Sequence, residues 1–140
     1  MRNNILYIAL RLLPWSENVL IESVKKAIAQ MESEGEYNKY SIICHHMTIA
    51  FGNQITDELY NYSKTHEGEV FPIKVISIGY SDKAIAFGVE TECPSANKIK
   101  HITLCTLGDG KPVDSNYITN WKPMSMPTDL QGKLTFMYRK

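Results

Sequence analysis

Two short stretches of this chain carry the same arrangement of histidine and threonine. The first reads HMT from His46 to Thr48, and the second reads HIT from His101 to Thr103. Side chains alternate across a β-strand, so the His and the Thr of each stretch are expected on one face of a strand. Two such strands facing each other across a cleft would place two imidazoles and two hydroxyls around one bound group.

This set of groups is suited to phosphodiester chemistry. Imidazole titrates near neutral pH, so one histidine can take a proton from the attacking oxygen while the other gives one to the leaving oxygen. Threonine hydroxyls can donate hydrogen bonds to the non-bridging phosphoryl oxygens as charge gathers there. We therefore predict His46, Thr48, His101 and Thr103 as catalytic residues, with no metal or other cofactor. The sequence does not say which histidine is the base and which is the acid.

The elements that must position these residues alternate between strands and helices. Strand-like runs cover residues 4–13, 41–51, 71–80, 83–90, 99–107 and 133–138. Helical patterns cover residues 16–33, with Ser16 as N-cap, and 56–64, with Thr56 as N-cap, and a helical turn is expected over 115–121. This order predicts an α+β domain with mostly antiparallel strands.

Strand alternation also makes predictions beyond the two motifs. It places Ala50 on the face of the first motif and Cys105 on the face of the second, with Phe51 on the opposite face of its strand. His45 should point away from His46 and have a structural role, because neighbours on a strand face opposite sides.

Composition limits the classes of partner. The chain has 140 residues, of which 44% are hydrophobic, and this predicts a single folded domain over residues 1–140. Fifteen basic residues balance fifteen acidic ones, so no strong field would attract duplex DNA or structured RNA. No apolar run approaches the roughly 18–20 residues of a membrane span. The three cysteines cannot all pair within the chain and no secretory signal is recognisable, so a cytoplasmic location is expected.

Three other interpretations compete with the His and Thr quartet. Cys44, His45, His46, Cys93 and His101 include zinc-ligand types, but they lack paired metal-binding spacing, and alternation should separate the two adjacent histidines. A cysteine nucleophile is disfavoured because Cys44 and Cys105 lie in strands that look buried. Chance composition could produce both motifs, although the two copies match in their apolar positions as well.

The paired HMT and HIT motifs resemble those of the two-histidine (2H) phosphoesterase superfamily. The resemblance implies a bilobal α+β fold, with mostly antiparallel strands around a central cleft and helices outside. Each lobe, roughly residues 1–66 and 67–140, would supply one motif, and the four motif residues carry over as the catalytic set. The stretch HITLCTLGDGKPVDSNYI, residues 101–118, is similar to the matching segment of the tRNA-ligase cyclic phosphodiesterase branch and of phage anti-CBASS phosphodiesterases.

This resemblance implies a phosphodiesterase that cleaves cyclic oligonucleotide immune signals in a host cytoplasm. The spacing between the motifs is shorter than in longer family members, which leaves the substrate more open than the chemistry. Enzymatic alternatives are a 2′,3′-cyclic phosphodiesterase of RNA repair and a 2′–5′ oligoadenylate phosphodiesterase. A non-enzymatic alternative is a sponge that binds cyclic nucleotides without cutting them, although binding alone requires neither an acid nor a base. The oligomeric state is not predicted.

Three further residues are candidates for holding the substrate. Tyr7 and Trp121 could stack on nucleobases, and Lys111 could meet a phosphate. Each also has a plain structural interpretation, namely a core tyrosine, a loop anchor and a solvated turn lysine. Ser115 and Asn116 are expected to cap and turn the backbone rather than to touch a ligand.

Overall fold

The computed structural model describes residues 4–33 and 40–139. Its strands are β1 (Ile5–Leu12), β2 (Tyr40–Ile42), β3 (His46–Phe51), β4 (Val70–Tyr80), β5 (Ala84–Glu90), β6 (His101–Leu107), β7 (Asn120–Pro123) and β8 (Leu130–Tyr138). The α-helices are α1 (Pro14–Ser33) and α2 (Asp57–Thr65), and short 3-10 helices are η2 (Gly52–Gln54) and η3 (Pro112–Tyr117). The predicted α+β class is confirmed.

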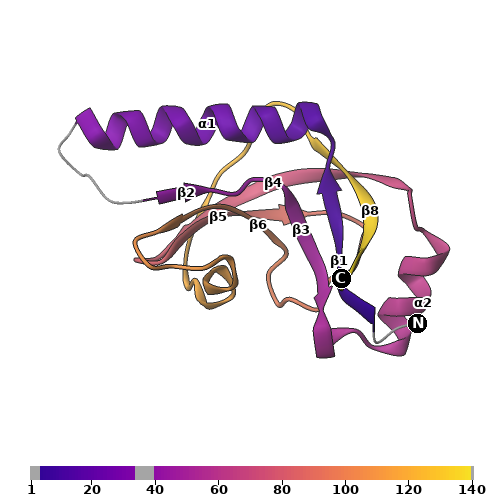
Figure 1. Ribbon diagram of the computed structural model, residues 1–140. Helices are drawn as coiled ribbons and strands as arrows, with labels where there is room; N and C mark the ends of the chain where they lie inside the picture. Colours follow the sequence, from indigo (N-terminus) through magenta and orange to yellow (C-terminus); the bar gives the residue numbers. More distant parts are fainter. Residues whose placement is uncertain (1–3, 34–39, 140) are drawn as a thin grey trace.

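The strands of the described residues form one antiparallel sheet in the order β2-β6-β3-β1-β8-β4-β5. An additional pairing between β5 and β6 closes six of these strands into a ring, while β7 pairs with β4. Figure 1 shows α1 along one side of this sheet and the orange turn of η3 on the other side. The strands of both proposed lobes therefore belong to one continuous sheet, and the division into two lobes stays a prediction.

Helix α1 begins two residues earlier than the predicted N-cap at Ser16. Pro14 occupies the first helical position, where its fixed φ angle is already helical and its missing N–H has no partner to lose. Ser16 is fully buried in the first turn instead, and its hydroxyl accepts a hydrogen bond of 2.9 Å from the backbone N–H of Gln131. This bond joins the start of α1 to β8.

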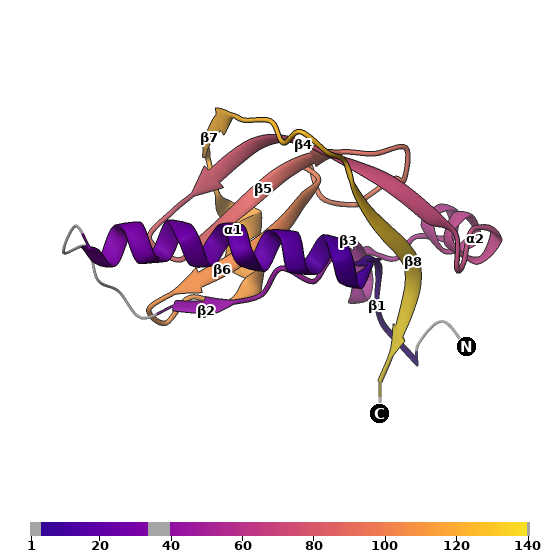
Figure 2. The ribbon, with the colours of Figure 1, turned by 90° about the horizontal axis from the view of Figure 1, so that it is seen from above.

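Helix α1 packs its apolar stripe against the sheet. Leu20 and Val24 belong to the same buried cluster as Leu10 of β1, Met47 of β3 and Ile102 of β6. Figure 2 shows α1 lying lengthwise over the strands, and it contacts β1, β6 and β8. Burial of these large side chains is worth about 1.5–3 kcal/mol each. None of the described helices has both the length and the apolar character needed to cross a membrane.

Helix α2 follows its predicted capping pattern. The Thr56 hydroxyl accepts a hydrogen bond of 3.2 Å from the backbone N–H of Leu59, as expected of an N-cap.

Two predicted boundaries differ from the structure. The strand expected over 41–51 is divided into β2 and β3, because Cys44 has a φ of 56°, in the left-handed region that interrupts a strand. The helical turn expected over 115–121 lies instead at η3, and it is followed by β7, which pairs with β4. Both differences alter the surroundings of the motif histidines.

Candidate active site

The structure brings the four motif residues together. His46 and Thr48 on β3, and His101 and Thr103 on β6, all line one small cavity of about 90 Å³. The two strands are antiparallel neighbours that pair at one point, between the central apolar residues of the two motifs. Those two residues are fully buried, so the His and Thr side chains lie on the opposite face, as strand alternation predicts.

Each motif strand carries a register shift directly after its threonine. Ile49 has no partner in β1, and Leu104 has none in β5. One extra residue in a strand moves every side chain that follows it to the opposite face of the sheet. Ala50 and Cys105 are therefore buried in the core, and Phe51 is 53% exposed and lines the cavity. The predicted faces of these three residues were wrong because simple alternation assumes an unbroken register.

The two motif strands are braced crosswise at these shifts. In each strand, the carbonyls of the motif threonine and of the next residue accept hydrogen bonds from the segment that leads into the other motif. The bonds are Ser95 Oγ to Thr48 O (2.8 Å), Ala96 N to Ile49 O (2.7 Å), Cys44 N to Thr103 O (3.0 Å) and Ile43 N to Leu104 O (2.8 Å). The segment that precedes each motif histidine therefore holds the strand of the other motif in place, and both motifs belong to one hydrogen-bonded frame.

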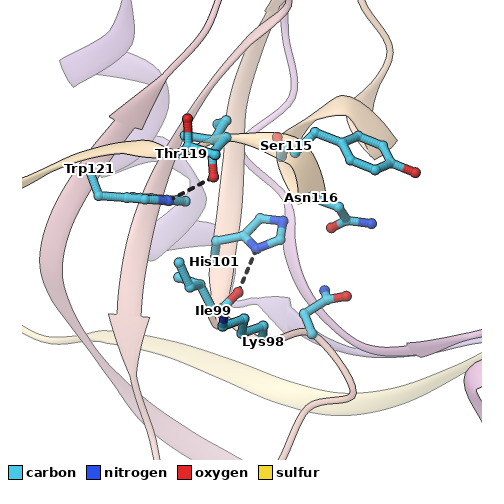
Figure 3. A pocket seen from close by; sticks show the side chains of 10 residues that line it. Lys98, Ile99, His101, Ser115, Asn116, Thr119 and Trp121 are labelled. Carbon is cyan, nitrogen blue, oxygen red and sulfur yellow. Dashed lines mark hydrogen bonds between the residues drawn. The ribbon is translucent and has the colours of Figure 1, made fainter.

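The ring of His101 has a defined tautomer. Its Nδ1 lies 2.8 Å from the carbonyl oxygen of Ile99, and a carbonyl can only accept, so Nδ1 carries the proton. The lone pair of the neutral ring is then on Nε2. Burial lowers the pKa of His101, and the hydrogen bond to Ile99 partly offsets this effect by stabilising the charged form. Figure 3 shows this ring between Trp121 and Asn116.

His45 does not point away from His46, contrary to the prediction. The two rings meet edge to edge, with centroids 4.6 Å apart and an interplanar angle of 21°, and their Nδ1 atoms are hydrogen-bonded at 2.5 Å. His45 precedes β3, in the bend that follows the left-handed Cys44, so the alternation of a strand does not apply to it. Sequence reasoning missed this pair because no local pattern indicates a positive φ at a cysteine.

The surroundings of His46 disfavour its charged form. Burial lowers its pKa to about 4, and His45, Arg11 and His101 contribute to this lowering by repulsion. Arg11 is the direct partner of His46 across the β1–β3 pair. At neutral pH His46 is therefore neutral in the unliganded protein.

This depressed pKa predicts a loss of stability in mild acid. An unfolded histidine binds its proton near pH 6.5, whereas His46 in the fold has a pKa of about 4. Between these values the unfolded state holds more protons, so the free energy of unfolding falls as the pH drops from 6.5 to 4, by about 3 kcal/mol from this residue. Urea unfolding at several pH values gives the free energy of unfolding at each pH. Between pH 6.5 and 4 this free energy should fall clearly less in His46→Gln than in the wild type, and an equal fall would contradict this attribution.

The three candidates for substrate binding have different positions. Tyr7 stacks on His46, with ring centroids 5.2 Å apart, and on Phe51, at 6.0 Å. Trp121 lies 6.5 Å from the ring of His101 and lines a second, larger cavity of about 490 Å³. Lys111 is exposed and lies outside the lining of both cavities.

The two cavities share three lining residues, and two of them, Asn97 and Asn116, were not selected by sequence reasoning. Asn97, His101 and Asn116 line both of them, so the larger cavity opens directly beside the motifs. Ser115 is buried, and its hydroxyl lies 2.8 Å from that of Thr103. Ser115 and Asn116 were expected only to turn the backbone, and it is the position of η3 against β6 that brings them to the site.

Trp121, which lines the larger cavity, packs closely against Gly79. This residue pairs with Trp121 across β4 and β7, and a Cβ placed on it would lie 2.5 Å from the indole ring. We expect Gly79→Ala to displace the indole and to cost about 1–3 kcal/mol of stability by overpacking. Thermal unfolding measures the loss of stability, and the tryptophan emission spectrum measures the displacement of the indole. The comparison variant is Gly68→Ala, where a Cβ has open space but an unfavourable φ, and it should leave the emission spectrum unchanged. An unmoved spectrum in Gly79→Ala would contradict this packing.

The three cysteines are buried and free, and burial raises the pKa of Cys44 and Cys93 to about 12 and that of Cys105 to about 11. A buried thiol with a raised pKa stays protonated and is a poor nucleophile. Among residues 4–33 and 40–139, no three His, Cys, Asp or Glu side chains gather into a group that could hold a metal ion.

The fold is similar to that of a solved fungal RNA kinase. The TM-score is 0.57 at 15% sequence identity, and the match covers 96% of this chain and 46% of the kinase chain. This chain thus spans about half the length of the protein that it matches. No family model matches the sequence, and neither does any curated protein. At this identity the likeness shows a shared fold.

Proposed function

We propose that this chain is a metal-independent phosphodiesterase that cleaves cyclic oligonucleotide immune signals of the anti-CBASS type. The observation that carries the proposal is the single cavity lined by His46, Thr48, His101 and Thr103. Two imidazoles and two hydroxyls at one point are the groups that a phosphodiester needs for proton transfer and charge stabilisation. The likeness of the fold to an RNA kinase is compatible with a nucleotide substrate.

In the proposed reaction, one imidazole removes the proton of the attacking hydroxyl as its oxygen bonds to phosphorus. This hydroxyl is a ribose 2′-hydroxyl, or water if the substrate is already a cyclic phosphate. The other imidazole gives a proton to the leaving oxygen as its bond to phosphorus breaks. The threonine hydroxyls donate to the non-bridging oxygens, where negative charge gathers. Each positioned acid or base contributes about 100- to 10,000-fold in rate.

Aromatic surfaces on both sides of the motifs favour a phosphate that joins two nucleosides. On the side of β3, Tyr7 and Phe51 form a stacked pair, and Phe51 is 53% exposed. On the side of β6, Trp121 and Tyr117 line the larger cavity, and Tyr117 of η3 is 74% exposed. A base stacked on an aromatic ring gains about 1–3 kcal/mol. A substrate with one base on each side would use both surfaces, whereas a mononucleotide would use only one.

The test is a substrate panel in the presence of a chelator. The panel contains cyclic dinucleotides, cyclic trinucleotides, a 2′,3′-cyclic mononucleotide and 2′–5′ oligoadenylate, and products are separated by chromatography. We expect turnover of a cyclic di- or trinucleotide. Turnover confined to the mononucleotide or to the 2′–5′ oligomer would replace the proposed substrate and keep the chemistry. Loss of turnover with the chelator, or binding with intact recovery, would contradict the proposed mechanism.

A further inference from the structure

We propose that His45 is a positioning residue that sets the tautomer of His46 and makes His46 the base of the pair. The inference rests on the proposed function, because it assigns the proton-transfer roles within the same site. Its observations are the hydrogen bond between the two Nδ1 atoms and the small angle of 21° between the two ring planes, which keeps that bond close to the plane of each ring. With Nδ1 of His46 engaged by His45, Nε2 is the nitrogen of His46 that remains for a ligand in the cavity.

The partners of the two motif rings differ in a way that assigns the acid. A histidine acting as acid must hold a proton on both nitrogens before transfer. His101 has a permanent acceptor for its Nδ1–H, the carbonyl of Ile99, which supports the charged ring. His46 has another imidazole as partner and Arg11 directly across the strand pair, so a second proton there is opposed by nearby positive charge. In the substrate complex, the negative charge of the bound phosphate favours a second proton on one of the two rings, and these partners place it on Nε2 of His101, so His46 is the neutral base.

A neutral base that acts through Nε2 must carry its proton on Nδ1. That proton can go only to the partner of Nδ1, so His46 donates to Nδ1 of His45, and His45 carries its own proton on Nε2. When His46 takes the proton of the attacking hydroxyl on Nε2, its Nδ1–H stays donated to His45. When His101 gives its Nε2 proton to the leaving oxygen, it returns to the neutral tautomer bound to Ile99. One proton is taken and one is given, so the step balances.

Several charged and aromatic groups face His46 and bear on its pH behaviour. They are His45 before β3, Arg11 and Tyr7 on β1 and His101 on β6, while Glu17 of α1 acts on His45 in the opposite sense to Arg11. Of these, His45 makes the ring-to-ring hydrogen bond. Replacing His45 with a residue that offers no acceptor should therefore change the tautomer of His46, and any uncharged replacement should raise the pKa of His46, since one source of repulsion is removed.

The experiment measures the ring ¹⁵N shifts of labelled histidines in the free protein at pH 7, in the wild type, His45→Asn and His45→Phe. We expect the His46 proton on Nδ1 in the wild type and in His45→Asn, whose amide oxygen can accept it. In His45→Phe, which keeps a ring but offers no acceptor, the proton should move to Nε2. A wild-type His46 proton on Nε2, or a tautomer unchanged in His45→Phe, overturns the proposal. No substrate is needed, so this result is independent of whether the proposed activity is found.

Turnover provides the second readout. We expect kcat of His45→Phe to fall about 10- to 100-fold with little change in KM, by analogy with the loss of the partner that orients a metal-binding histidine. His45→Asn should recover most of that loss and shift the acid limb of the pH–rate profile to higher pH. Equal losses in both variants would mean that His45 only supports packing, and would overturn the positioning role. Thermal unfolding of each variant checks that it is folded.

Discussion

Replacing either motif histidine with alanine should reduce kcat by about 100- to 10,000-fold. His46 and His101 line the same cavity from two paired strands, and in the proposed reaction each ring supplies one of the two proton transfers. Because acid and base act in one step, the double variant should be little worse than the weaker single variant. The measurement is steady-state turnover of the substrate identified by the panel.

The matched control for this prediction is His66→Ala. His66 closes the end of α2 and contacts Glu69 and Tyr62, outside the lining of both cavities. Its removal should leave kcat unchanged. Full turnover in either motif variant, or an equal loss in His66→Ala, would show that the chemistry does not depend on the two paired histidines.

Thr103→Val should lower kcat by about 100- to 1000-fold, the range found when one donor to a developing oxyanion is removed. The Thr103 hydroxyl is buried and lies 2.8 Å from that of Ser115. The Ser115 hydroxyl can donate to the Thr103 oxygen, and the Thr103 proton is then directed to a phosphoryl oxygen. Valine has nearly the same shape but no hydroxyl. The loss should therefore appear mainly in kcat, because the charge that the hydroxyl stabilises develops in the transition state.

Thr103→Ser is the matched control, since it keeps a hydroxyl at the same point of β6. It should retain most of the activity that the valine variant loses. If both variants were equally impaired, packing around β6 would explain the loss better than hydrogen bonding to the phosphate. Thr48→Val tests the same role on β3, where the backbone carbonyl is held by Ser95 and the side chain lines the cavity.

Strand alternation was sufficient to predict that the four motif residues share a face and can meet. It failed immediately after each threonine, because a register shift moves Ala50 and Cys105 into the core and Phe51 into the cavity. Such shifts depend on the partner strands and on the segments that bind the freed carbonyls, and these partners are distant in sequence. A pattern read along one strand carries no information about them.

The side chains that contact the motif residues could not be predicted from the sequence either. The contact of His45 with His46 depends on the left-handed backbone of Cys44, a conformation that non-glycine residues seldom adopt. The contribution of Ser115 depends on where η3 packs against β6, and a loop between strands has no periodicity that would fix this. The fold class and the quartet followed from local patterns, whereas the residues that tune the quartet followed from tertiary contacts.

The central claim is that the rings of His46 and His101 bind one phosphate together. Its most direct test is a titration of ring-¹⁵N-labelled protein with a non-cleavable phosphorothioate analogue of the best substrate in the panel. The account predicts that the Nε2 resonances of His46 and His101 move together with one dissociation constant, while those of His66 stay in place. Movement of only one of the two rings, or two different dissociation constants, would contradict it.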